Sequence, residues 1–261
     1  MNIVQRIKRK IARTHFLFQT KNHRTETRLA CRKLGTNYGG WYVPEEIIEK
    51  GSTCICAGAG EDISFDLELA RRFSCRILIV DPTPRAKSHF NKVRECLSNP
   101  STMPTDSDDG IPYDLEDIDF GKIEFVDRGI WKENKKMKFY APKNPDHVSH
   151  SILNCQNTLE FFEADCVTPA TLVRDFGLQG IEILKLDIET AEYDVIEQMM
   201  RENIRPKILC VEYDEGYNPL DGRWRTRIRD SVRALKDYGY ALCFVDAFNF
   251  TFIDDSQVPS L

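Results

Sequence analysis

The stretch that decides the fold is CICAGAGEDISFD, residues 54–66. It begins as an apolar run typical of a buried strand and turns at Gly58 and Gly60 into a segment with helical spacing of apolar residues. A strand, a glycine turn and a helix in this order are typical of the first unit of a sheet that binds a ligand at its strand ends.

The rest of the chain repeats this alternation of short apolar strands and amphipathic segments. The strands are apolar throughout, which is typical of a mainly parallel sheet covered by helices on both faces. The sequence therefore predicts an α/β, Rossmann-like fold that closes with an antiparallel hairpin through 247–249. Strands are expected at 53–57, 75–84, 122–131, 181–189, 207–215, 240–246 and 250–253, a hairpin strand at 135–142, and helices at 64–73, 85–97, 191–201 and from Trp224 to Leu235.

Composition limits the class of protein. The chain has 261 residues, 41% of them hydrophobic, which suits one sizeable core. No apolar run reaches the length of a membrane span. The nine cysteines include no CxxC pair, so we expect free, buried thiols in a reducing compartment and a cytoplasmic protein.

The charge is unevenly distributed. Residues 1–33 hold ten Lys or Arg and a single acid, Glu26, whereas the remainder is acidic. Residues 1–35 are interpreted as a basic helical extension and 36–261 as the Rossmann-like domain. The extension could lie on an anionic membrane, but packing on its own domain or on a second subunit is favoured. The acidic body argues against nucleic acid as a partner.

Acidic residues follow most of the predicted strands at their carboxyl ends. Parallel strands end at one edge of a sheet, so we expect these side chains to gather in one cleft. They are Asp81, Asp127, Asp187, Glu189, Glu212 and Asp214.

The glycine turn itself carries two acids, Glu61 and Asp62. A dinucleotide fingerprint would need a third glycine where Ile63 stands, and its pyrophosphate would face both acids. S-adenosylmethionine has no phosphate and carries an ammonium and a sulfonium, so the acids fit it better. Asp81 is placed to accept hydrogen bonds from the ribose hydroxyls. The alternative is that Glu61 and Asp62 only favour the helix N-terminus by charge.

Six motifs together resemble the FkbM-type methyltransferases, in the right order and over roughly residues 36–255. They are YGGW (38–41), GAGEDISFD (58–66), VDPTP (80–84), FYAPKNPDHVSHSILN (139–154), LKLDIETAEYDVI (184–196) and VEYDE (211–215). The resemblance implies a class I fold and methyl transfer from S-adenosylmethionine to a hydroxyl of a small molecule such as a sugar or natural product. The chain departs from the family at Cys56, where an acid is usual, and at Thr190, where glycine is usual. We expect Thr190 to cap the following helix.

The resemblance assigns candidate residues to each part of the site. The cofactor would contact Gly58, Ala59, Gly60, Glu61, Asp62, Asp81, Pro82, Asp127 and Tyr38.

Transfer to a hydroxyl usually needs a base, for which Asp187, Glu189, His147 and His150 are the candidates. Asp187, Glu212 and Asp214 could instead hold Mg²⁺, although nearby acids could equally pair with Lys185 or Arg201. Two other functions stay open: a non-catalytic binding module and, less favoured, an NAD-dependent oxidoreductase.

Overall fold

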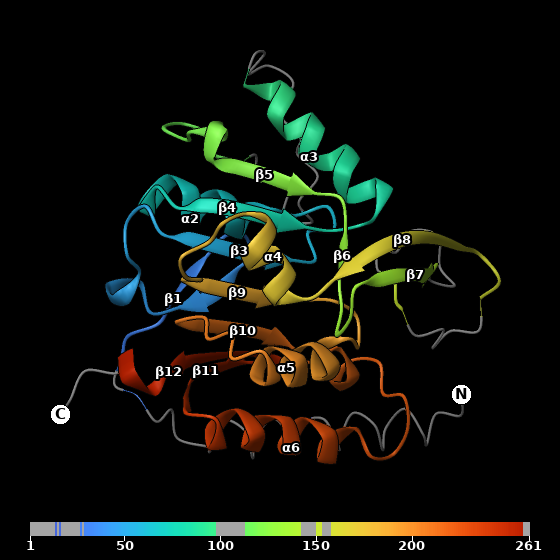
Figure 1. The fold of residues 1–261 in the computed structure, drawn as a ribbon. Helices are drawn as coiled ribbons and strands as arrows, with labels where there is room; N and C mark the ends of the chain where they lie inside the picture. Colours follow the sequence, from blue (N-terminus) through green and yellow to red (C-terminus); the bar gives the residue numbers. More distant parts are fainter. Residues whose placement is uncertain are drawn as a thin grey trace.

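The computed structural model describes residues 14, 16, 27, 29–97, 113–141, 150–152 and 158–257. Its centre is a seven-stranded sheet in the order β11-β12-β10-β9-β3-β4-β5 (Figure 1). The strands are β3 (Thr53–Ala57), β4 (Arg76–Val80), β5 (Ile123–Val126), β9 (Ile183–Leu186), β10 (Ile208–Glu212), β11 (Tyr240–Asp246) and β12 (Asn249–Asp254).

Five neighbouring strands of this sheet, from β5 to β10, are parallel. The last two form the expected hairpin, and β12 pairs antiparallel with both β10 and β11. The second strand of the hairpin, β12, therefore lies between β10 and β11. This arrangement confirms the predicted Rossmann-like class I methyltransferase fold.

Helices cover both faces of the sheet. Alternate residues of β3 show why: Ile55 and Ala57 pack in one core with α4, α5 and α6, while Cys54 and Cys56 pack in the other with α2 and α3. Side chains alternate across a strand, so a fully apolar strand needs a layer on each side. The helices are α2 (Ser64–Phe73), α3 (Pro84–Cys96), α4 (Pro169–Asp175), α5 (Glu192–Arg201) and α6 (Trp224–Asp237), with short 3₁₀ turns at Glu45–Ile47, Phe120–Lys122, Asp214–Gly216 and Asp255–Gln257.

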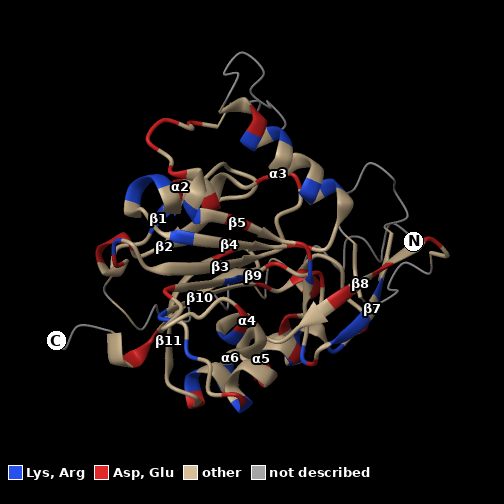
Figure 2. Cartoon of the chain, turned by 45° about the horizontal axis from the view of Figure 1, so that its top comes forward, with Lys and Arg blue, Asp and Glu red and all other residues tan. Residues whose placement is uncertain are grey.

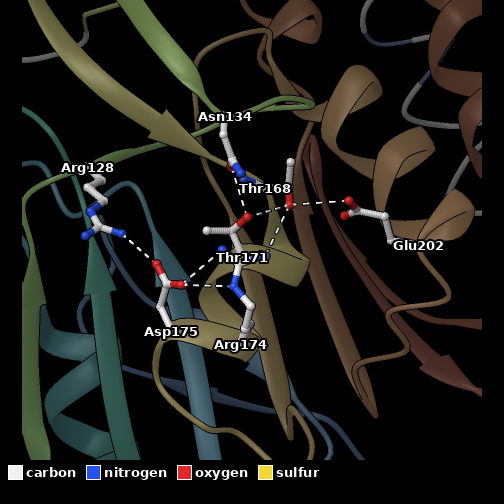
Figure 3. A network of polar contacts seen from close by, with 7 residues as sticks. All are labelled: Arg128, Asn134, Thr168, Thr171, Arg174, Asp175 and Glu202. Atoms are coloured by element: carbon white, nitrogen blue, oxygen red, sulfur yellow. Dashed lines mark hydrogen bonds and ion pairs between the residues drawn. The ribbon is translucent and has the colours of Figure 1, made fainter.

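Helix α4 was not predicted, although its start has a clear signal. Thr168 is the N-cap and accepts a hydrogen bond from the Thr171 backbone, and Pro169 follows in the first turn. Asn134 accepts from the Thr168 backbone and the Thr171 hydroxyl, 3.0 Å each, and Arg128 pairs with Asp175 (Figure 3). This network ties α4 to the chain that leaves β5.

Two small sheets flank the central one. β1 (Arg32–Leu34) and β2 (Trp41–Val43) form a hairpin, while β6 (Gly129–Ile130), β7 (Lys135–Tyr140) and β8 (Phe161–Val167) form a ribbon in the order β6-β8-β7. The ribbon lies on the side to which the arrows of β4, β9 and β10 point (Figure 1). β7 was expected, and β6 lies within the predicted strand 122–131, which the structure divides into β5 and β6; β8 and the β1–β2 hairpin were missed.

The basic helix predicted at the N-terminus lies outside the described residues, so its packing, membrane contact and role in oligomerisation stay predictions. In the described part, Phe16 packs against Trp224 and Phe248. The eight cysteines described there are all free, seven of them buried. No helix of the described residues is long and apolar enough to cross a membrane.

Gly58 provides a test of the fold. Its φ is +82°, and a Cβ added there would lie 1.7 Å from the Asp187 carbonyl oxygen. We expect Gly58→Ala to lose more than about 4 kcal/mol of unfolding free energy, or to prevent folding, because neither backbone can move without breaking its sheet. Denaturant titration measures the loss.

Gly51→Ala is the matched control. Gly51 also has positive φ, +78°, but nothing lies within 4 Å of an added Cβ. It should cost only the left-handed penalty of about 1–2 kcal/mol. Equal losses at both positions would show that the close approach to Asp187 is unimportant.

Candidate active site

A cavity of about 270 Å³ opens at the carboxyl ends of the central strands. It is lined by the glycine turn after β3, the ends of β4, β9 and β10, the loop between β1 and β2, and the ribbon. Figure 2 shows Asp and Glu positions, in red, along the backbone near these strand ends. Seven acids line the cavity, and Lys185 is the one Lys or Arg among its described lining residues; the acids are Glu61, Asp62, Asp81, Asp187, Glu189, Glu212 and Asp214.

The floor of the cavity is the glycine turn. The Gly58 amide donates to the Val80 carbonyl at 3.0 Å, and the Asp187 amide donates to the Ala57 carbonyl at 3.1 Å. These bonds extend the sheet beyond β3 and press Gly58 against the end of β9. The sequence predicted that Gly58 lets a ligand approach the backbone; in the structure its missing side chain makes room for the Asp187 carbonyl.

Asp81 fastens this turn from the end of β4. One carboxylate oxygen accepts from the amides of Ala59 and Gly60, at 2.8 and 3.2 Å, and the other accepts from the Thr83 amide and hydroxyl. Asp81 is buried yet lines the cavity. It therefore has a structural role beside the predicted contact with the ribose hydroxyls, which stays a prediction.

The two acids of the turn both have protein partners. Asp62 accepts from the Ser64 amide, at the first residue of α2, and from the Thr36 hydroxyl at 2.5 Å. Glu61 forms an ion pair of 2.7 Å with Arg85. The helix-terminus interpretation thus accounts for Asp62, and a partly exposed ion pair accounts for Glu61. Their attraction for a cationic ligand is weaker than the sequence alone suggested.

Lys185 lies beneath the turn with only 4% of its surface exposed. Its ammonium donates to the Gly58 carbonyl at 2.5 Å and lies 3.4 Å from the Asp187 carboxylate. Burial alone would lower the pKa of Lys185, but Asp187 and Asp66 outweigh it and raise the pKa. A permanent positive charge therefore holds the turn and balances part of the acid cluster.

Asp66 lies on the same side of the sheet, fully buried on α2. Burial raises its pKa to about 6, although Lys185 and a hydrogen bond from Cys56 favour the ionised form. Cys56 is itself buried and does not line the cavity. FkbM-type methyltransferases usually have an acid at position 56. This chain has the Cys56 thiol there, next to Asp66, a buried acid of α2.

Asp187 and Glu212 meet at the ends of β9 and β10. Burial, the Asp187 charge and a hydrogen bond with Asp187 raise the pKa of Glu212 well above its ordinary value. Glu212 therefore holds its proton to higher pH than an ordinary glutamate does. No group of three or more His, Cys, Asp or Glu within the described ranges has the geometry of a metal site. The structure thus gives no support to the predicted Mg²⁺ site of Asp187, Glu212 and Asp214.

The turn after β9 is strained. Glu189 and Thr190 both have positive φ, +53° and +74°, which is rare for a β-branched residue. The buried Glu192 carboxylate holds the turn by accepting from the amides of Ile188 and Thr190. Thr190 does not cap α5, whose N-cap is Ala191. The expected cap is therefore wrong, because the Thr190 hydroxyl donates to the Glu189 carbonyl instead.

The other predicted residues fall into three groups. Tyr38, Pro82 and His150 line the cavity, and the neighbouring Ser151 donates to the Glu189 carbonyl at 2.9 Å, which docks this segment on the strained turn. His147 lies outside the described residues. Asp127 does not line the cavity; it is half exposed and pairs with Lys87 of α3.

The cavity also includes residues that the sequence did not indicate: Lys185, Phe139, Tyr217, Asn218 and Asn249.

Asp81→Asn tests the fastening of the turn. An amide nitrogen cannot accept hydrogen bonds, so either the two turn amides or the two Thr83 donors lose their partner. We expect a loss of about 1–3 kcal/mol in unfolding free energy, measured by denaturant titration. Asp127→Asn, the equivalent change after the next strand, should cost less than about 0.5 kcal/mol because its ion pair is exposed. Equal effects would contradict the assignment.

Comparison with solved structures finds, among others, three that are each 10% identical to this chain, with TM-scores of 0.36 to 0.40. A fibrillarin pre-rRNA processing protein of Methanococcus jannaschii is 10% identical, with 80% of this chain and 68% of that chain covered and a TM-score of 0.40. A putative methyltransferase from Streptococcus mutans in complex with SAH is 10% identical, with 79% and 89% covered and a TM-score of 0.39. An rRNA methylase from Streptococcus thermophilus is also 10% identical, with 79% and 87% covered and a TM-score of 0.36.

No curated protein matches the sequence. The Methyltransferase FkbM domain, in contrast, matches residues 49–242, which is most of the chain and includes the glycine turn, Asp81, the β9 turn and Glu212. The chain therefore belongs to the FkbM methyltransferase family.

Proposed function

We propose that this methyltransferase uses S-adenosylmethionine to methylate a hydroxyl of a small, uncharged or cationic acceptor. The observation that carries the proposal is the charge of the cavity: seven acids line it, and its one described Lys is buried beneath the turn and faces two acids. A phosphate-bearing ligand would be repelled by the acids at the strand ends, whereas a sulfonium and an ammonium would be attracted.

The residues present fit this cofactor. Gly58, Ala59 and Gly60 line the cavity with backbone and little side chain, and the Asp81 carboxylate lies at their edge. When bound, S-adenosylmethionine supplies a methyl group activated by its positive sulfur. Gly58, Ala59, Gly60 and Asp81 would hold it, with Tyr38 of the β1–β2 loop above.

The acceptor would lie on the side of the β9 and β10 ends. Asp187 is the candidate to take its hydroxyl proton, because its carboxylate lines the cavity at the end of β9. His150 is the second candidate, placed at the mouth by the segment that docks on the β9 turn. Glu189 would orient the acceptor. A small molecule is favoured over RNA, because the acids would face the RNA backbone.

Titration calorimetry tests the cofactor without the acceptor. S-adenosylmethionine and S-adenosylhomocysteine should bind at micromolar concentration, about −8 kcal/mol, and NAD should not bind. Asp81→Asn should weaken binding, while Asp127→Asn should leave it unchanged. Binding of NAD alone would overturn the proposal, and binding of none of the three would favour a non-catalytic module.

The pH dependence of cofactor affinity tests the charge argument. Because the raised pKa of Glu212 leaves the Asp187–Glu212 pair protonated at low pH, the pair gains negative charge as pH rises. Affinity for the cationic S-adenosylmethionine should therefore increase several-fold from pH 5 to 8, about 1 kcal/mol. Affinity for S-adenosylhomocysteine, which lacks the sulfonium, should change less.

Glu212→Gln should remove most of this difference, because the pair then has no second proton to lose. Calorimetry with both ligands across the pH range measures it. If both ligands show the same pH profile in the original protein, the carboxyl pair does not face the sulfonium.

A further inference from the structure

Two cysteines far apart in the sequence meet at the edge of the central sheet. The sulfur atoms of Cys31 and Cys243 are 3.1 Å apart, although 212 positions separate them. A disulfide bond is about 2.05 Å long, so the sulfurs need to approach by only about 1 Å to be joined.

A bulge in β11 places Cys243 at this contact. Leu242 pairs with Phe252 and Phe244 pairs with Thr251, which leaves Cys243 between them as the extra residue of the strand. A bulge re-aims a side chain out of the regular alternation. The bulge here directs the Cys243 thiol at the Cys31 thiol.

The surroundings of the pair favour reaction. Thr27 donates to the Cys243 sulfur at 3.3 Å, and either cysteine can donate to the other. The bond from Cys31 and the bond from Thr27 lower the pKa of Cys243, while the same contact and burial raise the pKa of Cys31. Cys243 therefore loses its proton readily, while Cys31 keeps its proton. Thiolates, not thiols, react with peroxides and disulfides.

Access distinguishes this pair from the other thiol contact in the described chain. Cys54 and Cys75 also share a hydrogen bond, but both are fully buried in the core. Cys31 is partly exposed at the surface, whereas Cys243 is 2% exposed. An oxidant can thus reach the Cys31 sulfur directly, while the Cys243 sulfur is buried behind it.

We propose that Cys31 and Cys243 form an oxidisable dithiol, a modification site that reacts with a hydroperoxide and closes a disulfide between the N-terminal segment and β11. With Cys243 deprotonated, Cys31 passes its proton to Cys243 along their hydrogen bond, and the Cys31 thiolate so formed attacks a peroxide oxygen, which forms a sulfenic acid and releases one water after protonation. The Cys243 sulfur then attacks the Cys31 sulfur, the S–S bond forms, and hydroxide leaves as a second water. Two thiols are oxidised, and one hydrogen peroxide is reduced to two waters.

The bond would reach the active site through the β1–β2 hairpin. Cys31 immediately precedes β1, and the loop between β1 and β2 brings Tyr38 and Gly39 to the cavity. Tyr42 of β2 stacks on Phe244, the residue after Cys243, with ring centroids 4.3 Å apart. The disulfide would add a covalent link at the base of the hairpin, next to this stacking contact, and so fix the covering loop.

Peptide mapping tests the site independently of any cofactor. The fully reduced protein is treated with a few equivalents of hydrogen peroxide, its remaining thiols are alkylated in denaturant, and non-reduced digests are analysed by mass spectrometry. We expect two of the nine thiols to disappear in more than half of the chains, with a Cys31–Cys243 linked peptide as the main product. Amide hydrogen exchange of residues 29–43 should slow several-fold on oxidation.

Three variants serve as controls. Cys31→Ser and Cys243→Ser should each abolish the link, while Cys75→Ser, in the buried thiol contact, should leave it unchanged. Four outcomes would overturn the proposal: both cysteines remain alkylated, Cys31 stops at sulfinic acid while Cys243 stays alkylated, the link joins other cysteines, or hydrogen exchange in 29–43 is unchanged by the link.

Discussion

The close contact between Gly58 and the Asp187 carbonyl is the constraint on which the site depends. It brings the turn after β3 against the end of β9 so tightly that a Cβ would lie 1.7 Å from the carbonyl oxygen. Lys185 holds both sides, since its ammonium bonds the Gly58 carbonyl and lies beside the Asp187 carboxylate. The cavity floor, the acid cluster and the position of the neighbouring strands all follow from this junction.

Charge balance explains how so many acids occupy one cavity. Asp62 and Asp81 accept hydrogen bonds from backbone amides, Glu61 pairs with Arg85, and burial beside Asp187 raises the pKa of Glu212. Hydrogen-bond donors, an ion pair or a raised pKa thus offset the charge of four of the acids, and the lining as a whole remains acidic. The same acids hold the turns in place and give the cavity its acidic lining, so one set of residues serves both.

The N-terminal part of the domain closes the site from outside the Rossmann core. The β1–β2 hairpin is fixed to α2 through the Thr36 bond to Asp62 and to the far edge of the sheet through Tyr42 and Cys31. It therefore links the glycine turn, which follows the inner strand β3, to β11 at the edge of the sheet. The ribbon of β6, β7 and β8 covers the other side through Phe139 and the segment of His150.

The sequence by itself determined the elements whose signals are local. The glycine turn, the apolar strands, α2, the closing hairpin and the gathering of acids at strand ends were predicted correctly, because apolar periodicity and the edge rule of parallel sheets are sufficient for them. Only the tertiary structure decided the partners of each acid, the place of Lys185 and the separation of Asp127 from the cavity. These depend on which side chains meet across 20 to more than 200 residues, as Glu61 with Arg85 and Cys31 with Cys243 do. The β8 strand and α4 were missed although Thr168 and Pro169 marked the helix start, and β8, half exposed, lacks the continuous apolar run of the central strands.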